Sequence, residues 1–153
     1  MERLDQVKDV RLSRNLTVGD LLRLYGDIHG FMAEHVHKAV EILKKMKQEC
    51  DVRILAFTGN LVATGLRGII AQLLEAKAFN VVITTCGAID HDIARSHGGK
   101  YLKGTFDVDD KGLYDEGLHR LGNIFIPLAD YGPLIERAVF SSLREIRKMF
   151  PEK

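Results

Sequence analysis

Residues 80–95, NVVITTCGAIDHDIAR, carry the clearest strand pattern in this chain of 153 residues. Residues 81–85 are all β-branched, and β-branched side chains favour strands. The run lacks polar alternation, which is typical of a strand covered on both faces, as in a parallel sheet. A glycine, Gly87, then precedes a helical segment at 89–96. The stretch predicts a buried strand, a glycine turn and a helix.

The same order occurs earlier in the chain, at residues 53–74. A short apolar strand at 53–57 is cut off by Thr58, Gly59 and Asn60, and apolar residues then recur at helical spacing through 66–74. Two successive strand-turn-helix units predict an α/β fold with right-handed βαβ packing. A third strand at 122–127 and a closing helix at 135–149 complete the predicted pattern, with a loop containing at most short strands at 98–121.

The amino-terminal part of the chain predicts two helices. Thr17, followed three residues later by Asp20, is a variant of the capping box and predicts that a short helix begins there. After a break between Gly26 and Gly30, apolar residues at helical spacing predict a second amphipathic helix over 32–48. No linker or repeat divides the sequence, so a single domain is expected. Three strands make a thin sheet for a doubly wound domain, which indicates part of something larger.

Composition excludes several classes of protein. The chain has 22 basic and 21 acidic residues and is 46% hydrophobic, which fits a globular domain and gives no electrostatic footprint for nucleic acid. No apolar run approaches membrane-spanning length, so no membrane partner and a soluble, cytoplasmic location are expected. The two cysteines, Cys50 and Cys86, are expected to be free thiols.

Two segments follow the predicted parallel strands, at residues 57–65 and 85–92. Ligands bind at the carboxyl ends of such strands, where helix N-termini direct N–H groups at anions. Gly59 permits close backbone approach, and Asn60 can hydrogen-bond a ligand or cap a helix. Neither segment contains GxGxxG or a P-loop, so spacing alone leaves a nucleotide site and ordinary turn chemistry both open.

The triplet Asp90, His91 and Asp92 allows more than one interpretation. The acids can simply complement the dipole of a helix N-terminus. Adjacent helical residues point about 100° apart, so one metal ion is not expected to bind all three. His91 as a general acid/base, or Asp90 as acceptor for a cationic substrate, suits the sheet edge better. Cys86 has no evident base partner, which favours a packing role over a nucleophile.

Four motifs together resemble one family: FTGNLVATGLRGII at 57–70, the stretch at 81–95, YLKGTF at 101–106 and GLHRLGNIFIP at 117–127. They are similar to the amino-terminal half of deoxyhypusine synthase, in its archaeal-type branch, over nearly the whole chain. The resemblance implies a Rossmann-like parallel sheet flanked by helices, here incomplete. It also implies an NAD-dependent transferase that acts as a homotetramer of chains roughly twice this length.

The implied reaction oxidises spermidine with NAD, passes its aminobutyl group to an active-site lysine as an imine, and then transfers it to a lysine of a translation initiation factor precursor. The polyamine-facing acidic pair of the family falls on Asp90 and His91. Many members have a second acid where this chain has His91, whose imidazole can still hydrogen-bond substrate or cofactor. The resemblance places the cofactor loops at Gly59, Asn60, Leu61, Val62 and Ala63, and at Thr85, Cys86 and Gly87.

No lysine of this chain matches the imine-forming motif, which the family carries in its carboxyl-terminal half, so no catalytic residue is expected here. We expect residues 1–153 to be one partial domain that acts in a homo- or hetero-oligomer with a carboxyl-terminal half chain. Two alternatives stay open. One is a non-catalytic regulatory or scaffolding paralogue that binds NAD or a full synthase. The other is a homospermidine synthase-type enzyme.

Overall fold

The computed structural model describes residues 4–150, and its contacts divide the chain into two compact units. The first unit extends to Arg53 and the second begins at Ile54. Each unit is described by itself. The assignment of the whole chain to one partial domain stays a prediction.

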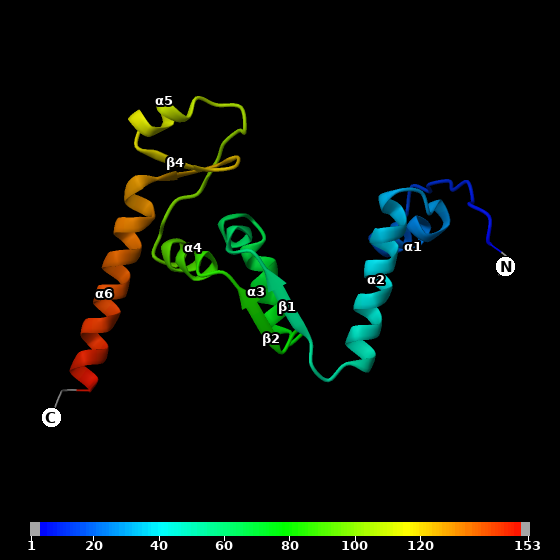
Figure 1. Ribbon diagram of the computed structural model, residues 1–153, viewed down its shortest axis with the longest axis horizontal. Helices are drawn as coiled ribbons and strands as arrows, with labels where there is room; N and C mark the ends of the chain where they lie inside the picture. The colour runs from blue at the N-terminus through cyan, green and yellow to red at the C-terminus, as the bar shows by residue number, and fades with distance from the viewer. Residues whose placement is uncertain (1–3, 151–153) are drawn as a thin grey trace. The chain divides into compact units, whose positions relative to one another are not determined.

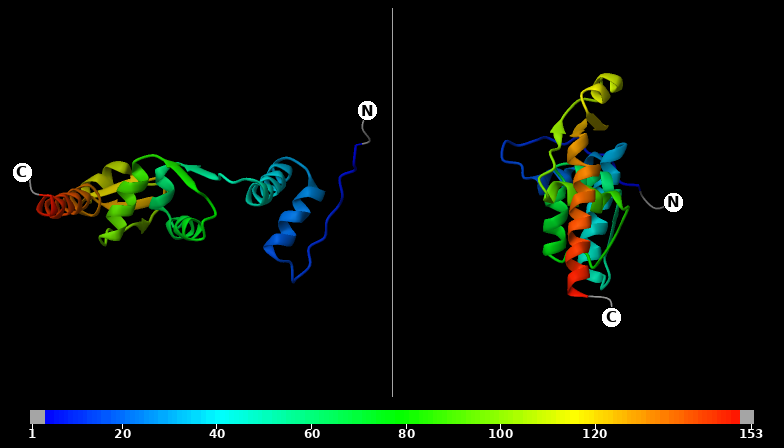
Figure 2. Two further views of the ribbon diagram at one scale, coloured as in Figure 1. Left: turned by 90° about the horizontal axis from the view of Figure 1, so that it is seen from below. Right: turned by 90° about the vertical axis from the view of Figure 1, so that its left-hand side faces the viewer.

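The amino-terminal unit is built on two helices that pack against each other, α1 (Val18–Ile28) and α2 (Met32–Glu49) (Figure 2). The predicted capping box is present: the Asp20 amide donates to Thr17 Oγ1 at 3.1 Å, and the Thr17 amide donates to the Asp20 carboxylate at 3.0 Å. Gly26 lets the helices approach, because a Cβ there would lie 2.9 Å from the His37 ring. Both predicted helices are confirmed, although α1 continues through Gly26, where the break was expected to begin, to Ile28.

The second unit contains the predicted parallel strands. β1 (Ile54–Phe57) pairs in parallel with β2 (Val81–Thr84) over their full lengths. Between them lie a 3-10 helix, η1 (Gly59–Ala63), and α3 (Arg67–Glu75), while α4 (Gly87–Ser96) follows β2 (Figure 1). The two strand-turn-helix units and their parallel pairing are therefore confirmed. The Rossmann-like class stays a prediction.

A separate antiparallel sheet follows α4. It consists of β3 (Leu102–Lys103), β5 (Ile124–Pro127) and β4 (Leu118–Leu121), in that order across the sheet. The prediction that residues 122–127 add a third strand to the parallel sheet was wrong. Only Gly122, at φ +61°, and Asn123 separate β4 from β5. So short a turn permits antiparallel pairing alone, since parallel strands need a long crossover.

A short helix, α5 (Asp110–Asp115), lies in the segment that was predicted to be a loop. Asp109 caps it by accepting hydrogen bonds from the amides of Lys111 and Gly112. An aspartate at the N-cap is a readable start signal, so the sequence did contain the information. The chain closes with a 3-10 turn, η2 (Leu128–Asp130), and α6 (Gly132–Met149).

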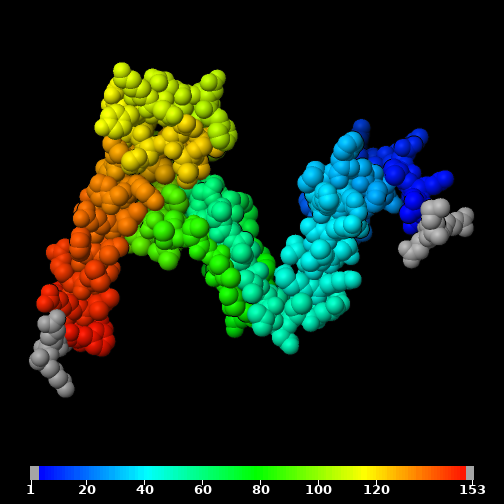
Figure 3. All heavy atoms as spheres, viewed as in Figure 1, coloured from blue at the N-terminus to red at the C-terminus, as the bar shows by residue number. Residues whose placement is uncertain are grey.

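The buried core of the second unit is small, and none of its residues belongs to the two parallel strands. All four residues of β2 are exposed, including Ile83 at 57%. The expectation that this strand is covered on both faces was therefore wrong for this chain. The carboxyl-terminal half of α6 is also exposed and stands clear of the other elements of its unit (Figures 1 and 3). Among residues 4–150, the buried apolar residues are Val62, Ala63, Ala88, Ala94, Leu113, Ile126 and Ala138.

Within residues 4–150, no helix is both long enough and apolar enough to cross a membrane.

Candidate functional site

The loops after β1 and β2 lie against each other. The Gly59 amide donates to Thr85 Oγ1 at 2.9 Å. A Cβ on Gly59 would lie 2.3 Å from the Ala88 nitrogen and 2.6 Å from the Gly87 carbonyl carbon. These are backbone atoms that cannot move aside cheaply, so only glycine fits at this crossing. The two predicted site segments therefore meet at one edge of the parallel pair.

The first loop, η1, turns part of its surface inward. The Val62 and Ala63 side chains are buried, and η1 packs against α4. Leu61 is half-buried and Asn60 is exposed. The Asn60 Oδ1 accepts a hydrogen bond from Thr58 Oγ1 at 2.5 Å, which leaves its amide NH₂ available to a ligand. Among the five predicted residues of this loop, Asn60 is the one with an outward polar side chain.

The second loop exposes backbone donors at a helix start. Hydrogen bonds at the start of α4 use the amides of Ala88, Ile89 and Asp90. The amides of Cys86 and Gly87 have no such partner within residues 4–150. A Cβ on Gly87 would meet nothing closer than 3.9 Å, so its own packing leaves space there. Two free amides at a helix N-terminus suit an anion such as a phosphate group.

The three residues of the Asp-His-Asp triplet point to different surroundings. Asp90 lies in the first turn of α4 and is half-buried. Asp92 faces α3, where its carboxylate accepts from Arg67 Nε at 2.6 Å. His91 is only 7% exposed. The three side chains thus have different surroundings, and the expectation that they do not share one metal ion stays a prediction.

His91 is held by two tyrosines from later in the chain. Its Nδ1 shares a 2.8 Å hydrogen bond with the Tyr101 hydroxyl, and its ring centroid lies 5.1 Å from that of Tyr131. Burial holds the pKa of His91 below its ordinary 6.5, against the opposing effect of Asp90. Burial also raises the pKa of Tyr101 to about 12. The pair is therefore a neutral imidazole and a protonated phenol at pH 7.

The structure thus gives His91 internal partners, and its predicted contact with substrate stays a prediction. Sequence reasoning missed Tyr101 and Tyr131 as its neighbours. Tyr101 lies in one of the motifs that carried the resemblance, but no spacing rule connects position 91 with position 131, because the chain between them forms the antiparallel sheet.

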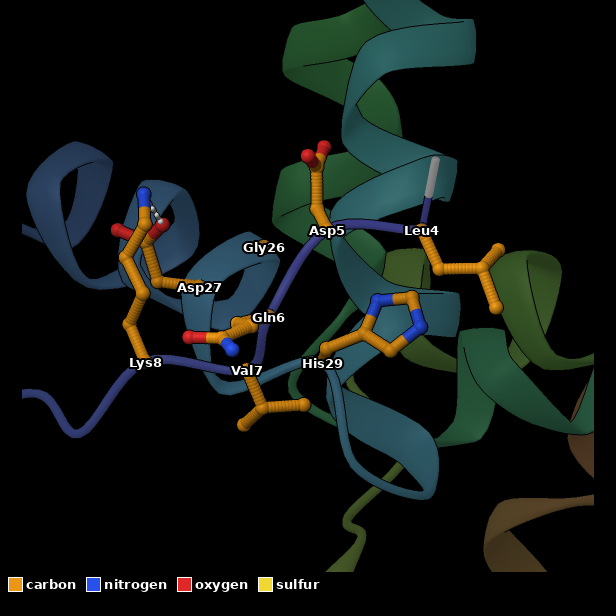
Figure 4. A pocket seen from close by; sticks show the side chains of 8 residues that line it. All are labelled: Leu4, Asp5, Gln6, Val7, Lys8, Gly26, Asp27 and His29. Atoms are coloured by element: carbon orange, nitrogen blue, oxygen red, sulfur yellow. Dashed lines mark hydrogen bonds and ion pairs between the residues drawn. The ribbon is translucent and has the colours of Figure 1, made fainter. Parts of the chain in front are cut away.

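Two hollows lie elsewhere in the molecule. One, of about 790 Å³, belongs to the amino-terminal unit (Figure 4), where Lys8 Nζ pairs with Asp27 at 2.9 Å. The other, of about 490 Å³, lies between α3 and α4 and is mostly apolar. It includes Val62 from the first loop but not Thr85, Cys86 or Gly87. Asn60, Asp90 and His91 line neither hollow.

Fold and site together define an α/β protein with a candidate anion-binding edge made of two loops. The family model for deoxyhypusine synthase matches residues 20–152. The chain therefore belongs to the deoxyhypusine synthase family.

Curated relatives agree with this assignment, and all three described here carry the name "Probable deoxyhypusine synthase". The chain is 58% identical to the protein of Aeropyrum pernix, over 89% of this chain and 44% of the relative. It is 51% identical to that of Ignicoccus hospitalis, over 94% of this chain and 45% of the relative. It is 52% identical to that of Sulfolobus acidocaldarius, over 92% and 43% respectively. The chain spans less than half the length of these relatives.

Proposed function

We propose that this chain forms the amino-terminal part of an NAD-dependent deoxyhypusine synthase. The complete enzyme transfers the aminobutyl group of spermidine to a lysine of a translation initiation factor precursor in the cytoplasm. The observation that carries the proposal is the junction of the two loops, where the Gly59 amide donates to Thr85 Oγ1. Family membership, shown by the match over residues 20–152, supplies the reaction class.

The two loops hold the cofactor in this proposal. The free amides of Cys86 and Gly87 bind phosphate oxygens at the positive end of α4. The Asn60 side chain offers its NH₂ group as a further donor. Bound NAD supplies the hydride acceptor for oxidation of an amine. The contribution of this chain is to bind and orient the cofactor at a preorganised edge.

Asp90 provides the charge that a polyamine requires. Its carboxylate lies one helical turn from Gly87, so cofactor and substrate meet at the same helix start. An ammonium group binds a partly buried carboxylate more strongly than an exposed one, because solvent screens the pair less. His91 follows Asp90 in the chain, and its hydrogen bond with the Tyr101 hydroxyl fixes the position of its imidazole ring. Asp90 is therefore the substrate-binding acid of this half.

A carboxyl-terminal part of the family's chain completes the enzyme. The exposed apolar faces of β1 and β2, with Ile54 at 51% and Ile83 at 57% exposure, need a covering segment. That segment supplies the imine-forming lysine, for which this chain offers no matching residue. The active assembly is a homo- or hetero-oligomer in which the two parts share each site.

A reconstitution experiment tests this proposal. The 153-residue chain is mixed with the carboxyl-terminal remainder of the Aeropyrum pernix relative, and transfer from labelled spermidine to the factor precursor is measured with and without NAD. We expect NAD-dependent transfer by the mixture alone. The Asp90→Asn variant should raise the KM for spermidine by about tenfold or more, whereas Asp92→Asn, which alters only the Arg67 ion pair, should not.

Other outcomes separate the alternatives. Transfer by the isolated chain would contradict the prediction that this chain lacks the imine-forming lysine. NAD binding without transfer in any mixture favours a regulatory or scaffolding paralogue. Transfer to putrescine in preference to the protein acceptor favours a homospermidine synthase-type enzyme.

A further inference from the structure

Arg95 connects the last turn of α4 to the far end of the first loop. Its Nη1 donates to the carbonyl oxygens of Val62 at 2.9 Å and of Thr64 at 2.7 Å. Both carbonyls lie where η1 ends, and carbonyls there carry partial negative charge. The guanidinium carbon also lies 5.5 Å from the centroid of the Tyr101 ring. A half-buried cation therefore donates two hydrogen bonds to carbonyl acceptors at the end of η1.

The first loop is consequently fixed at both ends by the same strand-helix segment. Thr85, just after β2, accepts from the Gly59 amide where η1 begins. Arg95, near the end of α4, donates to the carbonyls where η1 ends. Between these points η1 packs against α4. The direction of Asn60 relative to the Cys86 and Gly87 amides thus depends on two hydrogen-bonded anchors.

Another arginine on a neighbouring helix provides a contrast. Arg67 joins α3 to α4 through hydrogen bonds to Asp92 and Ser96 and not through the carbonyls at the end of the first loop. Its loss should alter the packing of α3 without releasing η1. Of these two arginines, Arg95 is therefore the one suited to hold the loop.

We propose that Arg95 is a positioning residue for the cofactor, which acts by holding the Gly59–Ala63 loop in register with the amides at the start of α4. The inference rests on the proposed function, because the loop's ligand is the cofactor of that proposal. Arg95 itself makes no contact with the ligand. Its effect on binding is transmitted through the two carbonyls.

The test compares Arg95→Met, Arg95→Lys and a control, Arg137→Met, on the exposed side of α6. Amide hydrogen exchange of residues 59–64 is measured on the full chain, and NAD affinity by calorimetry on the same samples. We expect exchange and the NAD dissociation constant to rise about tenfold in the methionine variant, since loss of charge-assisted hydrogen bonds misplaces the loop. Lysine should recover most of the affinity, because its ammonium group restores a charged donor for the two carbonyls.

The outcomes distinguish the two proposals. If the wild-type chain and its reconstituted mixture do not bind NAD, the proposed function fails and the positioning role falls with it. If wild type binds NAD and exchange at 59–64 is unchanged in Arg95→Met, Arg95 does not hold the loop. Faster exchange with unaltered NAD affinity reduces Arg95 to a structural contact and overturns the inference. Should the methionine variant fail to fold, Arg95→Gln, which removes the charge but keeps a polar side chain, replaces it in the same two readouts.

Discussion

The carboxyl ends of β1 and β2 and the strands themselves are packed very differently. At the ends, Gly59, Val62 and Ala88 are buried, and the Gly59 amide is hydrogen-bonded to Thr85 across the two loops. Along the strands, apolar side chains such as Ile54 and Ile83 are about half exposed. Within the described residues, the loops that carry the candidate site are therefore packed against each other, whereas the strands that precede them are left largely uncovered. The following changes test this contrast, from the largest expected effect to the smallest.

Gly59→Ala should have the largest effect. The added Cβ would lie 2.3 Å from the Ala88 nitrogen, so the two loops must separate, at a cost of about 3 kcal/mol in the free energy of unfolding. Gly65→Ala is the matched control, because a Cβ there meets nothing within 4 Å. Denaturant unfolding of both variants measures the difference. Equal stability would show that the loops are not tightly joined.

The same substitution on a buried and an exposed strand tests the contrast directly. Ile126→Thr, in β5 at 3% exposure, should cost about 2 kcal/mol through a lost methyl group and a buried hydroxyl. Ile83→Thr, in β2 at 57% exposure, should change the isolated chain by less than about 0.5 kcal/mol. The second change should instead weaken assembly with a carboxyl-terminal partner, measured by co-purification. Comparable unfolding costs would mean that β2 is covered.

Removal of one tyrosine hydroxyl should have an intermediate effect. Tyr101→Phe removes the hydrogen bond to His91 and should lower the free energy of unfolding by about 1 kcal/mol. Tyr131→Phe is the control, since the hydroxyl of Tyr131 has no hydrogen-bond partner within residues 4–150 and only its ring packs on His91. Thermal unfolding at constant pH separates the two. A larger loss for Tyr131→Phe would contradict the assigned bond.

The buried His91 should make stability depend on pH on the mildly acidic side. Its pKa is lowered in the folded state, chiefly by burial, so the unfolded chain takes up the proton first. The stabilising contribution of the neutral imidazole is complete above pH 6.5. It is lost as the pH falls from that value through the folded pKa. Unfolding measured between pH 5 and 7.5 should show this slope in wild type and a weaker one in His91→Gln.

Asp92→Asn should have the smallest effect. The carboxylate is more than half exposed where it meets Arg67, and exposed ion pairs contribute little because solvent screens them. We expect a loss of less than about 0.5 kcal/mol, reduced further by salt. A loss above about 1 kcal/mol would show that α3 and α4 depend on this pair for their packing.

Local patterns predicted the elements that depend on neighbours in sequence. The β-branched run at 81–85 and the Thr17–Asp20 capping box each specify their element, because strand preference and capping act over a few residues. The meeting of the two loops was also predictable, since carboxyl ends of parallel strands share one edge. The helix after Asp109 was readable but missed.

The position of residues 122–127 was decided by chain connection rather than pattern. An apolar strand fits either sheet, and the two-residue turn at Gly122 forces it against β4. The surroundings of His91 were equally hidden from the sequence, because its partners come from 10 and 40 residues away through the antiparallel sheet. Burial there comes from the combined packing of several elements, which no local pattern contains.

By itself, the sequence determined the family, the parallel strand pair and the two loops that carry the candidate site. Only the tertiary structure decided that Gly59 is needed for the crossing of the loops, that Arg95 holds the end of η1, and that the strands remain exposed. The physical reason is that propensity and capping are local, whereas close approach, burial and hydrogen-bond partnership depend on which distant segments the fold brings together.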